Sequence, residues 1–523
     1  MKIEGTSILG TERGKRRGRK FAALNPVDGG DLPGEFHSAS TEEVEIAAGL
    51  ATDAFAAFSQ WTGARRSALM NRIAELLEAG QEAIVSRASL ETALPRPRLQ
   101  GELARTCFQL RFYGEAAAKG LCAGARIDHA DPARKPLPKP DVRSLSRPIG
   151  PVAVFGSSNF PLAYSTAGGD TASAFAAGCP VIVKAHPAHP GTAEIVGSLI
   201  QQAARDIAAP TGIFSLLFDD GYEIGTSLVR HPRIKAVGFT GSLRGGRVLM
   251  DLAAARQEPI PVFAEMSSIN PVFIFPEILR QNPGELAAAL HASVTLGVGQ
   301  FCTNPGLVFL AADDGANIFL QKLESLMSAT PPGAMLTPAI GAAYRAGVDK
   351  FSRWPGVRRL TPENPDNSAA GAALFVTDAK TFLASPELME EVFGPSTLVV
   401  HFASPQDLPA IIHKLTGQLT ATIHTSIAEL AAHRELIALL EMKVGRLVFN
   451  GFPTGVEVCH AMTHGGPYPA TADGRSTSVG TRAIERFLRP VSFQNFPDSA
   501  LPDELKEANP LGIWRLVDGR LTL

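Results

Sequence analysis

From residue 151 onward, short apolar runs alternate with small-residue stretches, and this alternation constrains the fold more than any other feature. The first runs are Val152–Phe155, Val181–Val183, Ile213–Leu217, Ala236–Phe239 and Val262–Ala264. The stretches between them are rich in alanine and glycine and have helical character. Near-continuous apolar strands that alternate with helices indicate a parallel sheet covered on both faces. With right-handed crossovers, the sequence predicts an α/β, doubly wound, Rossmann-like domain.

A second α/β unit is expected after Asn270-Pro271, because apolar runs continue beyond this point. They are Val272–Phe275, Val308–Leu310, Leu398–His401 and Arg446–Asn450. Before residue 131 the chain is expected to be mainly helical. Ser40 and Glu43 form a capping box ahead of an apolar-periodic run, and two further helices are expected at 69–77 and 98–119.

Two segments are expected to be extended rather than helical. Residues 131–143 are rich in proline and charge, which indicates a boundary or an excursion from the domain. A strand-like stretch at 144–146 ends this segment, and residues 486–497 are extended and apolar.

Composition excludes several classes of function. The chain has 523 residues, 45% of them hydrophobic, which is enough for at least two domains. A charged fraction of 19% and a formal net charge of -2 argue against nucleic-acid binding, membrane-surface binding and disorder. No window has the roughly 18 uninterrupted apolar residues of a spanning helix, so we expect a soluble protein.

The cysteines and the basic run at 13–20 bear on the compartment. Five cysteines scattered over a long chain do not suggest a disulfide framework, and a reducing cytoplasm fits them best. The basic run RGKRRGRK is followed by no apolar segment, so it does not resemble an export signal. We therefore expect a cytoplasmic protein.

Three residues are candidates for chemistry, although each has an ordinary structural interpretation. Cys302 lies in the glycine-bracketed stretch GQFCTNPG, which could present a thiolate, but a lone cysteine is more often a small buried hydrophobe. Glu265 ends an apolar strand, where open α/β sheets bind ligands, and a raised pKa would make it a general base. Asn159 closes another strand and could donate to an oxyanion, or form an Asx turn.

Two further clusters are weaker signals. The turn FTGSLRGG at 239–246 lies between a strand and a helix, which suits a phosphate at a helix N-terminus. It is not GxGxxG, and glycines in such turns are common. Cys459, His460 and His464 lie close together in the sequence, but their spacing matches no standard zinc site. We interpret them as loop packing with solvent-facing histidines and expect no metal.

The joint order of these pieces is more specific than any one of them. The chain resembles the aldehyde dehydrogenase superfamily over nearly its whole length. The matching blocks, in order, are PIGPVAVFGSSNFPLAYSTAGGD, PVIVKAHP, VGFTGS, FAEMSSINP, GQFCTNPG, EEVFGPS and FNGFPTGVEV. Through KAHPAHPGT and FNGFPTGVEVCHAMTHGGPYPAT it looks closest to bacterial NADP-linked 2-oxoglutarate semialdehyde (2,5-dioxovalerate) dehydrogenases.

The resemblance implies roles for the candidate residues. Cys302 matches the nucleophile that forms a thiohemiacetal and then a thioester, and Asn159 matches the oxyanion donor, assisted by the backbone N–H of Cys302. Glu265 matches the base for the thiol or for the hydrolytic water. The remaining positions match cofactor-binding residues, namely Ser158, Lys184, His186, Pro187, Gly241, Ser242, Gly246, Glu391 and Phe393.

The cofactor is expected to be NADP, with NAD still usable. Many NAD-preferring relatives place a glutamate three residues after the lysine, where this chain has Pro187. No carboxylate remains there to repel a 2′-phosphate. Lys184 and His186 could instead face that anionic group.

The expected reaction is oxidation of 2-oxoglutarate semialdehyde to 2-oxoglutarate. Its distant carboxylate would suit Arg105, which lies one helical turn from Gln109 on the helix that lines the substrate tunnel in this family. Phe160 and Phe452 are candidate apolar walls, and equally candidate core residues.

Other functions remain as alternatives. One is a broad-range dehydrogenase of aliphatic or fatty aldehydes. CoA-acylating relatives tend to lack the equivalent of Glu265, which this chain keeps. A non-catalytic binding relative is a further alternative, although such proteins usually lose the thiol or the base.

The resemblance also implies three domains and an oligomer. We expect a dinucleotide-binding domain at 1–135 plus 150–265, a catalytic domain at 266–485, and an extended β oligomerisation arm at 136–149 plus 486–500. Because an isolated hairpin gains little by itself, a partner surface is expected. A homodimer or homotetramer should result.

Overall fold

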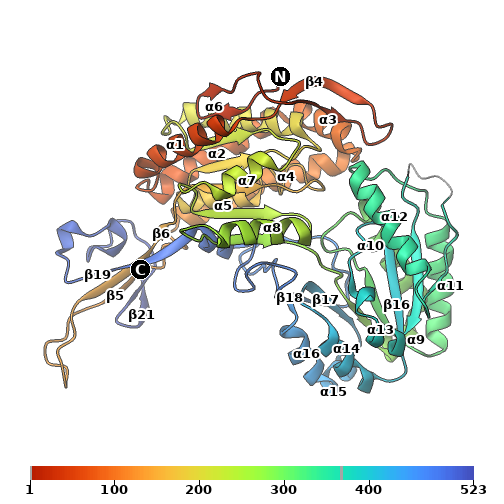
Figure 1. Ribbon diagram of the computed structural model, residues 1–523. Coiled ribbons are helices and arrows are strands. Elements are labelled where there is room, and N and C mark those ends of the chain that lie inside the picture. The colour runs from red at the N-terminus through yellow and green to blue at the C-terminus, as the bar shows by residue number, and fades with distance from the viewer. Residues whose placement is uncertain (1–2, 365–368) are drawn as a thin grey trace.

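The computed structural model describes residues 3–364 and 369–523 and has two α/β units and a projecting β arm (Figure 1). In Figure 1 the first unit carries the N-terminus at the top, the second unit lies at the lower right, and the arm projects at the lower left. The C-terminus lies beside the arm. No helix in the described part of the chain is long and apolar enough to cross a membrane.

The first unit is built on a seven-stranded sheet in which five neighbouring strands, counted from one edge, are parallel. In spatial order the strands are β11 (Val262–Glu265), β10 (Ala236–Thr240), β7 (Val152–Phe155), β8 (Val181–Lys184), β9 (Phe214–Leu217), β1 (Ile8–Leu9) and β2 (Glu12–Arg13). Strand β1 runs antiparallel to β9 and to β2. A separate antiparallel hairpin consists of β3 (Lys20–Leu24) and β4 (Asp31–His37).

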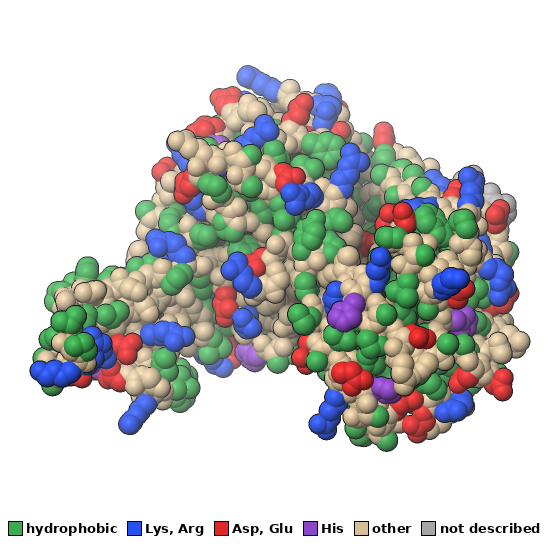
Figure 2. All heavy atoms as spheres, turned by 60° about the horizontal axis from the view of Figure 1, so that its bottom comes forward, with side chains coloured by type: hydrophobic (Ala, Val, Ile, Leu, Met, Phe, Trp, Pro, Cys, Tyr) green, Lys and Arg blue, Asp and Glu red, His purple; other side chains and the backbone are tan. Residues whose placement is uncertain are grey.

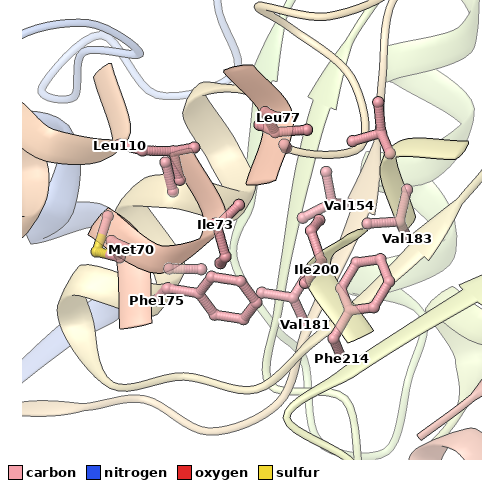
Figure 3. Packing of buried hydrophobic residues seen from close by; sticks show 14 of the residues in the cluster. Met70, Ile73, Leu77, Leu110, Val154, Phe175, Val181, Val183, Ile200 and Phe214 are labelled. Carbon is pink, nitrogen blue, oxygen red and sulfur yellow. The ribbon is translucent and has the colours of Figure 1, made fainter. Parts of the chain in front are cut away.

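Helices cover both faces of this sheet. They are α1 (Thr41–Phe58), α2 (Gly63–Ala79), α3 (Gln81–Thr92), α4 (Arg96–Ala118), α5 (Gly169–Ala177), α6 (Pro190–Asp206), α7 (Glu223–Arg230) and α8 (Leu243–Ala254). Side chains alternate along each strand, so Val181 and Val183 join the core under α2, α4, α5 and α6, whereas Ile182 joins the core under α1, α7 and α8. Figure 3 shows Phe175 and Ile200 beside Val181, with Met70 on the other side of Phe175.

The second unit repeats this plan with a second seven-stranded sheet. In spatial order its strands are β14 (Arg358–Arg359), β15 (Ala373–Asp378), β16 (Ser396–Phe402), β13 (Leu307–Ala311), β12 (Val272–Ile274), β17 (Gln418–His424) and β18 (Val444–Phe449). In the described part of this sheet, β14 runs antiparallel to β15, and the other neighbouring strands are parallel. The helices are α9 (Pro276–Gln281), α10 (Pro283–Thr295), α11 (Asp314–Ser328), α12 (Pro338–Ser352), α13 (Ala379–Ala384), α14 (Leu408–Lys414), α15 (Ile427–Ala432) and α16 (Arg434–Glu441).

The arm is a five-stranded sheet with its own small core. Its spatial order is β19 (Leu488–Gln494), β6 (Val142–Pro148), β5 (Arg126–Asp128), β20 (Arg515–Val517) and β21 (Arg520–Thr522). Leu501, Leu505 and Ile513 pack on Ile127 and Leu145 to form that core. The sheet therefore extends beyond the ranges 136–149 and 486–500 expected from sequence, because the last residues of the chain fold back and pair with β5.

The two α/β units are joined by the chain that follows β18. Residues 470–472 run beside β11, where Met266 N–H donates to Ala470 O at 2.8 Å and Ala472 N–H donates to Ala264 O at 2.9 Å. The 3-10 helix Thr481–Phe487 then leads into the arm. Other 3-10 helices are Leu296–Gly299, Pro386–Met389, Pro405–Asp407, Asp498–Ala500 and Asp503–Leu505. This return path brings C-terminal loops against the strand that carries Glu265.

Most elements expected from sequence are present. The predicted α/β class and the nine apolar runs correspond to strands, and Ser40 with Glu43 caps α1 by the predicted capping box. Helix α3 and strands β15 and β17 were not predicted.

On the face in Figure 2, positive and negative side chains are interspersed rather than gathered by sign, as the small net charge suggests.

Candidate functional site

The loop that carries Cys302 is bent sharply and held by amide side chains. Gly297, Val298 and Gly299 have φ angles of 56°, 58° and 65°, so three successive residues take the left-handed conformation just before the thiol. For a β-branched residue such as Val298 this is strained backbone. Asn270 Nδ2 lies 2.9 Å from the carbonyl oxygens of both Cys302 and Asn304. The loop is therefore a preformed support for the thiol.

Asn159 approaches this loop from the other unit, at the carboxyl end of β7. Its Nδ2 donates to Gln300 O at 3.0 Å, which places the amide beside the backbone just before Cys302. Its own carbonyl accepts from Arg98 Nη2 at 2.8 Å. The Arg98 guanidinium lies over the rings of Phe160 and Phe301, 4.9 and 4.7 Å from their centroids. Arg98 thus holds the main chain of Asn159, and the Gln300 carbonyl holds its side-chain amide.

Glu265 ends β11 and is bound on both carboxylate oxygens. Oε1 lies 2.8 Å from His464 Nε2, and Oε2 accepts from Ser478 Oγ at 2.9 Å. The same His464 nitrogen lies 3.6 Å from Cys302 Sγ. Thiol, imidazole and carboxylate therefore meet at one point, although they come from three distant parts of the chain.

The proton equilibria of this cluster differ from the sequence-based expectation. Burial alone would raise the pKa of Glu265, but His464 and Ser478 lower that pKa below its ordinary value. The prediction of a raised pKa for Glu265 is therefore wrong, because its negative charge has two partners. Burial and the adjacent Glu265 carboxylate raise the pKa of Cys302 well above its ordinary value. At rest the thiol is protonated and the carboxylate is ionised.

The expectation that His464 faces solvent is also wrong. His464 is 1% exposed, whereas His460 is exposed. Gly465 and Gly466 pack so closely on neighbouring backbone that a Cβ on either would clash, and this packing turns His464 inward. Ligand atoms of Glu265, Cys302 and His464 lie within 4.8 Å of one another. Zinc accepts all three ligand types, so the expected absence of a metal stays a prediction.

The carboxyl ends of the parallel strands in the first sheet form an edge whose groups suit a dinucleotide. Lys184 ends β8 and donates through Nζ to Asp219 O at 2.6 Å, and burial lowers its pKa to about 8. Ser242 caps the 12-residue helix α8, with its Oγ accepting from Gly245 N–H at 3.2 Å. A Cβ at Gly246 would lie 2.5 Å from Met266 Sδ, so a larger residue here would require the Met266 side chain to shift. These groups suit phosphates at a helix N-terminus.

A cavity of about 580 Å³ lies beyond the end of this edge. His186, Pro187, Asp220 and Arg345 line it. Burial and the nearby His189 lower the pKa of His186 well below its ordinary value, so this ring is neutral at neutral pH. Lys184 is therefore a better candidate than His186 for contact with an anionic group.

Glu391 and Phe393 lie on the side of the second unit. Both line a small pocket together with Gly299 and Phe301, next to the nucleophile loop. Burial raises the pKa of Glu391 to about 7, although Ser267 and Ser268 lower it by hydrogen bonding. The residues expected at the nicotinamide end thus lie near Cys302, and Lys184 lies further along the edge, at the end of β8.

Comparison with known proteins decides the family. Residues 13–490 match the aldehyde dehydrogenase family. The chain belongs to this family. It is 47% identical to alpha-ketoglutaric semialdehyde dehydrogenase 2 of Azospirillum brasilense over 523 residues, covering 99% of this chain and 100% of the relative. It is 44% identical to alpha-ketoglutaric semialdehyde dehydrogenase of Acinetobacter baylyi, covering 99% of each.

Solved structures agree at the level of the fold. NADP-dependent glyceraldehyde-3-phosphate dehydrogenase from Bacillus halodurans C-125, complexed with NADP, has a TM-score of 0.80 at 21% identity. The match covers 94% of this chain and 99% of that one. The predicted aldehyde dehydrogenase fold is confirmed. As a member of this family the chain is an oxidoreductase that acts on an aldehyde, and its cofactor is NADP or NAD.

The residues predicted to contact substrate divide into two groups. Phe160 packs edge-on against Tyr164 and Phe301, and Arg105 donates to Tyr164 OH at 3.3 Å, so both lie near the thiol loop. Gln109 is 1% exposed and contacts Tyr113 OH on its own helix. Phe452 packs on His424 and on the core under α9, α10 and α11, which supports its core interpretation.

Several site residues were not recognised from the sequence. Asn270 and Tyr164 lie inside matched blocks but were given no role, Ser478 had no motif of its own, and His464 was visible only as part of a zinc-like cluster. Arg446 of β18 is a further example. It donates to the carbonyls of Pro453 at 2.6 Å and Gly455 at 3.0 Å, and its charge acts on Cys302. The sequence signal that could have indicated Arg446 is its place as a charged residue within an otherwise apolar run.

Proposed function

We propose that this aldehyde dehydrogenase converts 2-oxoglutarate semialdehyde to 2-oxoglutarate through a thioester on Cys302. The convergence of thiol, carboxylate and amide on one loop carries the catalytic part. The names of the two relatives that match the whole chain support the substrate, since 2-oxoglutarate and alpha-ketoglutarate are the same acid.

In the first half-reaction, the ionised Glu265 accepts the proton of Cys302 as sulfur attacks the aldehyde carbon. The Asn159 amide, whose Nδ2 has a second N–H, donates to the developing alkoxide together with the backbone N–H of Cys302. A bound nicotinamide dinucleotide supplies the hydride acceptor. The carbon then remains on Cys302 as a thioester.

Before the second half-reaction, Glu265 releases the thiol proton to solvent and is ionised again. Glu265 then accepts a proton from water as the water oxygen attacks the thioester carbonyl. The carbon–sulfur bond breaks, the electron pair returns to sulfur, and the acid leaves. Retention of Glu265 supports hydrolysis rather than transfer to CoA. A thiol suits both halves, because it is a good nucleophile and a good leaving group.

The test is a cofactor-monitored assay with 2-oxoglutarate semialdehyde beside simple aliphatic and fatty aldehydes. We expect kcat/KM to be highest for the semialdehyde. A higher value for a long aliphatic aldehyde would favour a broad-range enzyme. No activity with any aldehyde in a reduced sample would favour a non-catalytic relative.

Arg105 is proposed to bind the distant carboxylate of the substrate. Its guanidinium contacts the carbonyl of Val456 and the hydroxyl of Tyr164, and its buried Nε has no partner among the described residues. A charge-assisted hydrogen bond contributes about 1.5–3 kcal/mol, or roughly 10- to 100-fold in affinity. The predicted partner Gln109 stays a prediction.

For Arg105→Ala we expect KM for 2-oxoglutarate semialdehyde to rise by about 10- to 100-fold, while KM for propanal stays unchanged. Steady-state kinetics with both aldehydes measures this. Arg111→Ala is the matched control, because Arg111 lies on the same helix but pairs with Glu78 at the surface. Equal effects on both aldehydes would argue for a merely structural Arg105.

NADP is proposed as the preferred cofactor. Pro187 lines the cavity at the end of the cofactor edge, where a carboxylate would repel a 2′-phosphate. Asp220 also lines this cavity, but its charge is paired with Arg19 at 2.5 Å. Arg345, on α12 of the second unit, adds a positive charge to the lining of this cavity.

For Pro187→Glu we expect the ratio of kcat/KM for NADP to that for NAD to fall by about tenfold or more. The reason is that the new carboxylate would repel the 2′-phosphate of NADP, which NAD lacks. The uncharged variant Pro187→Gln should leave the ratio within a few-fold of the native value. A native enzyme that strongly prefers NAD would contradict the proposal.

We also infer a homodimer or homotetramer in a reducing, cytoplasmic compartment. Strands β18 and β19 each lie at the edge of a sheet, where unpaired backbone groups can pair with another copy. All five cysteines are free, as a reducing compartment allows. Light scattering should give a mass of at least two chains, and a monomeric mass would contradict the assembly.

A further inference from the structure

One buried imidazole touches both the nucleophile and the base. His464 Nε2 lies 2.8 Å from Glu265 Oε1 and 3.6 Å from Cys302 Sγ. The main chain of His464 is held as well, since its N–H donates to Thr477 Oγ1 at 2.8 Å. The mechanism given above uses the thiol and the carboxylate but assigns nothing to this ring.

The chemistry of the partners determines where the hydrogen lies. Glu265 is ionised, and an ionised carboxylate only accepts hydrogen bonds. At 2.8 Å, His464 Nε2 must therefore carry the hydrogen and donate it to Oε1. A nitrogen that already carries this hydrogen cannot also accept the proton of the Cys302 thiol. His464 is thus a donor and not the base.

The negative charge moves during the reaction, and this donor lies within reach of both places that the charge occupies. At rest the charge is on Glu265, and Nε2 lies nearer to the carboxylate than to the neutral thiol. Once the thiol proton has passed to Glu265, the carboxyl group is neutral and sulfur carries the charge. The same N–H can then donate to sulfur by a shift of the ring of under 1 Å.

We propose that His464 is a catalytic hydrogen-bond donor whose Nε2–H follows the negative charge between Glu265 and Cys302. In acylation the S–H bond breaks, an O–H bond forms on Glu265, and the N–H stabilises the thiolate until its electron pair bonds to the aldehyde carbon. In deacylation the carbon–sulfur bond breaks, and the N–H stabilises the departing thiolate. This inference rests on the proposed roles of Cys302 and Glu265, but not on the identity of the aldehyde.

Other ionisable groups face this cluster and must be held constant in any test. They are Tyr164 before α5, Glu391 before β16 and Arg446 on β18. Burial raises the pKa of Tyr164, so its hydroxyl remains neutral. These groups are the same in every variant of His464, so a difference between variants reports on the donor alone.

The test compares His464→Leu, which removes the donor, with His464→Gln, whose side-chain amide can donate from a similar position. The readout is the rate of iodoacetamide alkylation at Cys302 from pH 5 to 10, followed by mass spectrometry of its peptide, without aldehyde or cofactor. We expect His464→Leu to react about tenfold more slowly at pH 7, with its profile moved up by about one pH unit. His464→Gln should stay within a few-fold of the native rate.

Two outcomes contradict the proposal. A native rate in His464→Leu overturns the proposal. An equal loss in both variants also overturns it, because it would show that a titrating imidazole is needed. If His464→Leu fails to fold by thermal melting, His464→Phe fills the space without a donor and takes its place. His460→Gln, on the same loop but exposed, should alkylate at the native rate.

The same alkylation, repeated with an aldehyde present, separates this proposal from the proposed function. If an aldehyde does not protect Cys302 from alkylation in the native enzyme, the role of Cys302 as the nucleophile fails, whatever the variants of His464 do. Protection by aldehyde together with identical profiles for His464→Leu and the native protein would leave the nucleophile in place and remove only the role of His464.

Discussion

Replacement of Cys302 by alanine should abolish aldehyde oxidation while leaving the fold intact. Removal of the nucleophile from a covalent enzyme leaves no route to the thioester, so we expect kcat to fall by at least roughly 10⁴-fold. The residue as a whole is half-buried, and its thiol has two polar neighbours, His464 at 3.6 Å and the Glu265 carboxylate. Because Asn270 holds the loop through the main chain of Cys302, little stability should be lost. Spectrophotometry of cofactor reduction measures the activity, and thermal melting measures the stability.

Cys122→Ala is the matched control, since this cysteine is also half-buried but lies near the arm, beside Thr481. It should keep native activity. Residual turnover in Cys302→Ala above about one part in 10³ would require another nucleophile among the remaining cysteines. Binding of NADP should persist in both variants, because the groups expected to hold it lie on the edge of the first sheet.

Replacement of Glu265 by glutamine should separate the two halves of the reaction. Loss of a positioned base costs about 10²- to 10⁴-fold, and hydrolysis should suffer more than acylation. A thiol ionises by itself at alkaline pH, whereas bulk water has a pKa of 15.7. Raising the pH should therefore restore a burst of reduced cofactor, up to one per site, without restoring steady turnover.

Rapid mixing of enzyme, cofactor and aldehyde at pH 7 and pH 9.5 measures the burst and the steady rate separately. Ser478→Ala is the matched control. It removes one partner of Glu265 but keeps the carboxylate, so both phases should slow by only a few-fold. Full steady turnover in Glu265→Gln at either pH would assign the hydrolytic base to another group.

Nine strands of the two main sheets were predictable because each appears in the sequence as a short apolar run. Strands β15 and β17 were missed although they are buried. Helix α3 was missed because only Gly80 separates it from α2, which leaves a weak boundary signal. Cys302, Glu265 and Asn159 were found because sequence motifs surround them. Their roles as nucleophile, base and oxyanion donor remain proposals until the variants are measured.

The surroundings of those residues could not be predicted, because they depend on contacts between distant segments. His464 lies 199 residues from Glu265 and 162 from Cys302 in the sequence. The spacing of residues within a motif carries no information about contacts between segments so far apart in the sequence. The error in the direction of the Glu265 pKa has the same origin, since the expectation counted its burial and not its two partners.

The small core of the arm bears on how copies of the chain would come together. The match to the family ends at residue 490, yet Leu501, Leu505 and Ile513 follow it and cover Ile127 and Leu145. A hairpin without this cover would have to order itself as it meets another copy, and the lost entropy would weaken and slow the encounter. Here a lone protomer already presents a shaped surface. In the proposed oligomer, assembly would then be the docking of two preformed surfaces, with an association rate set by diffusion and orientation rather than by folding.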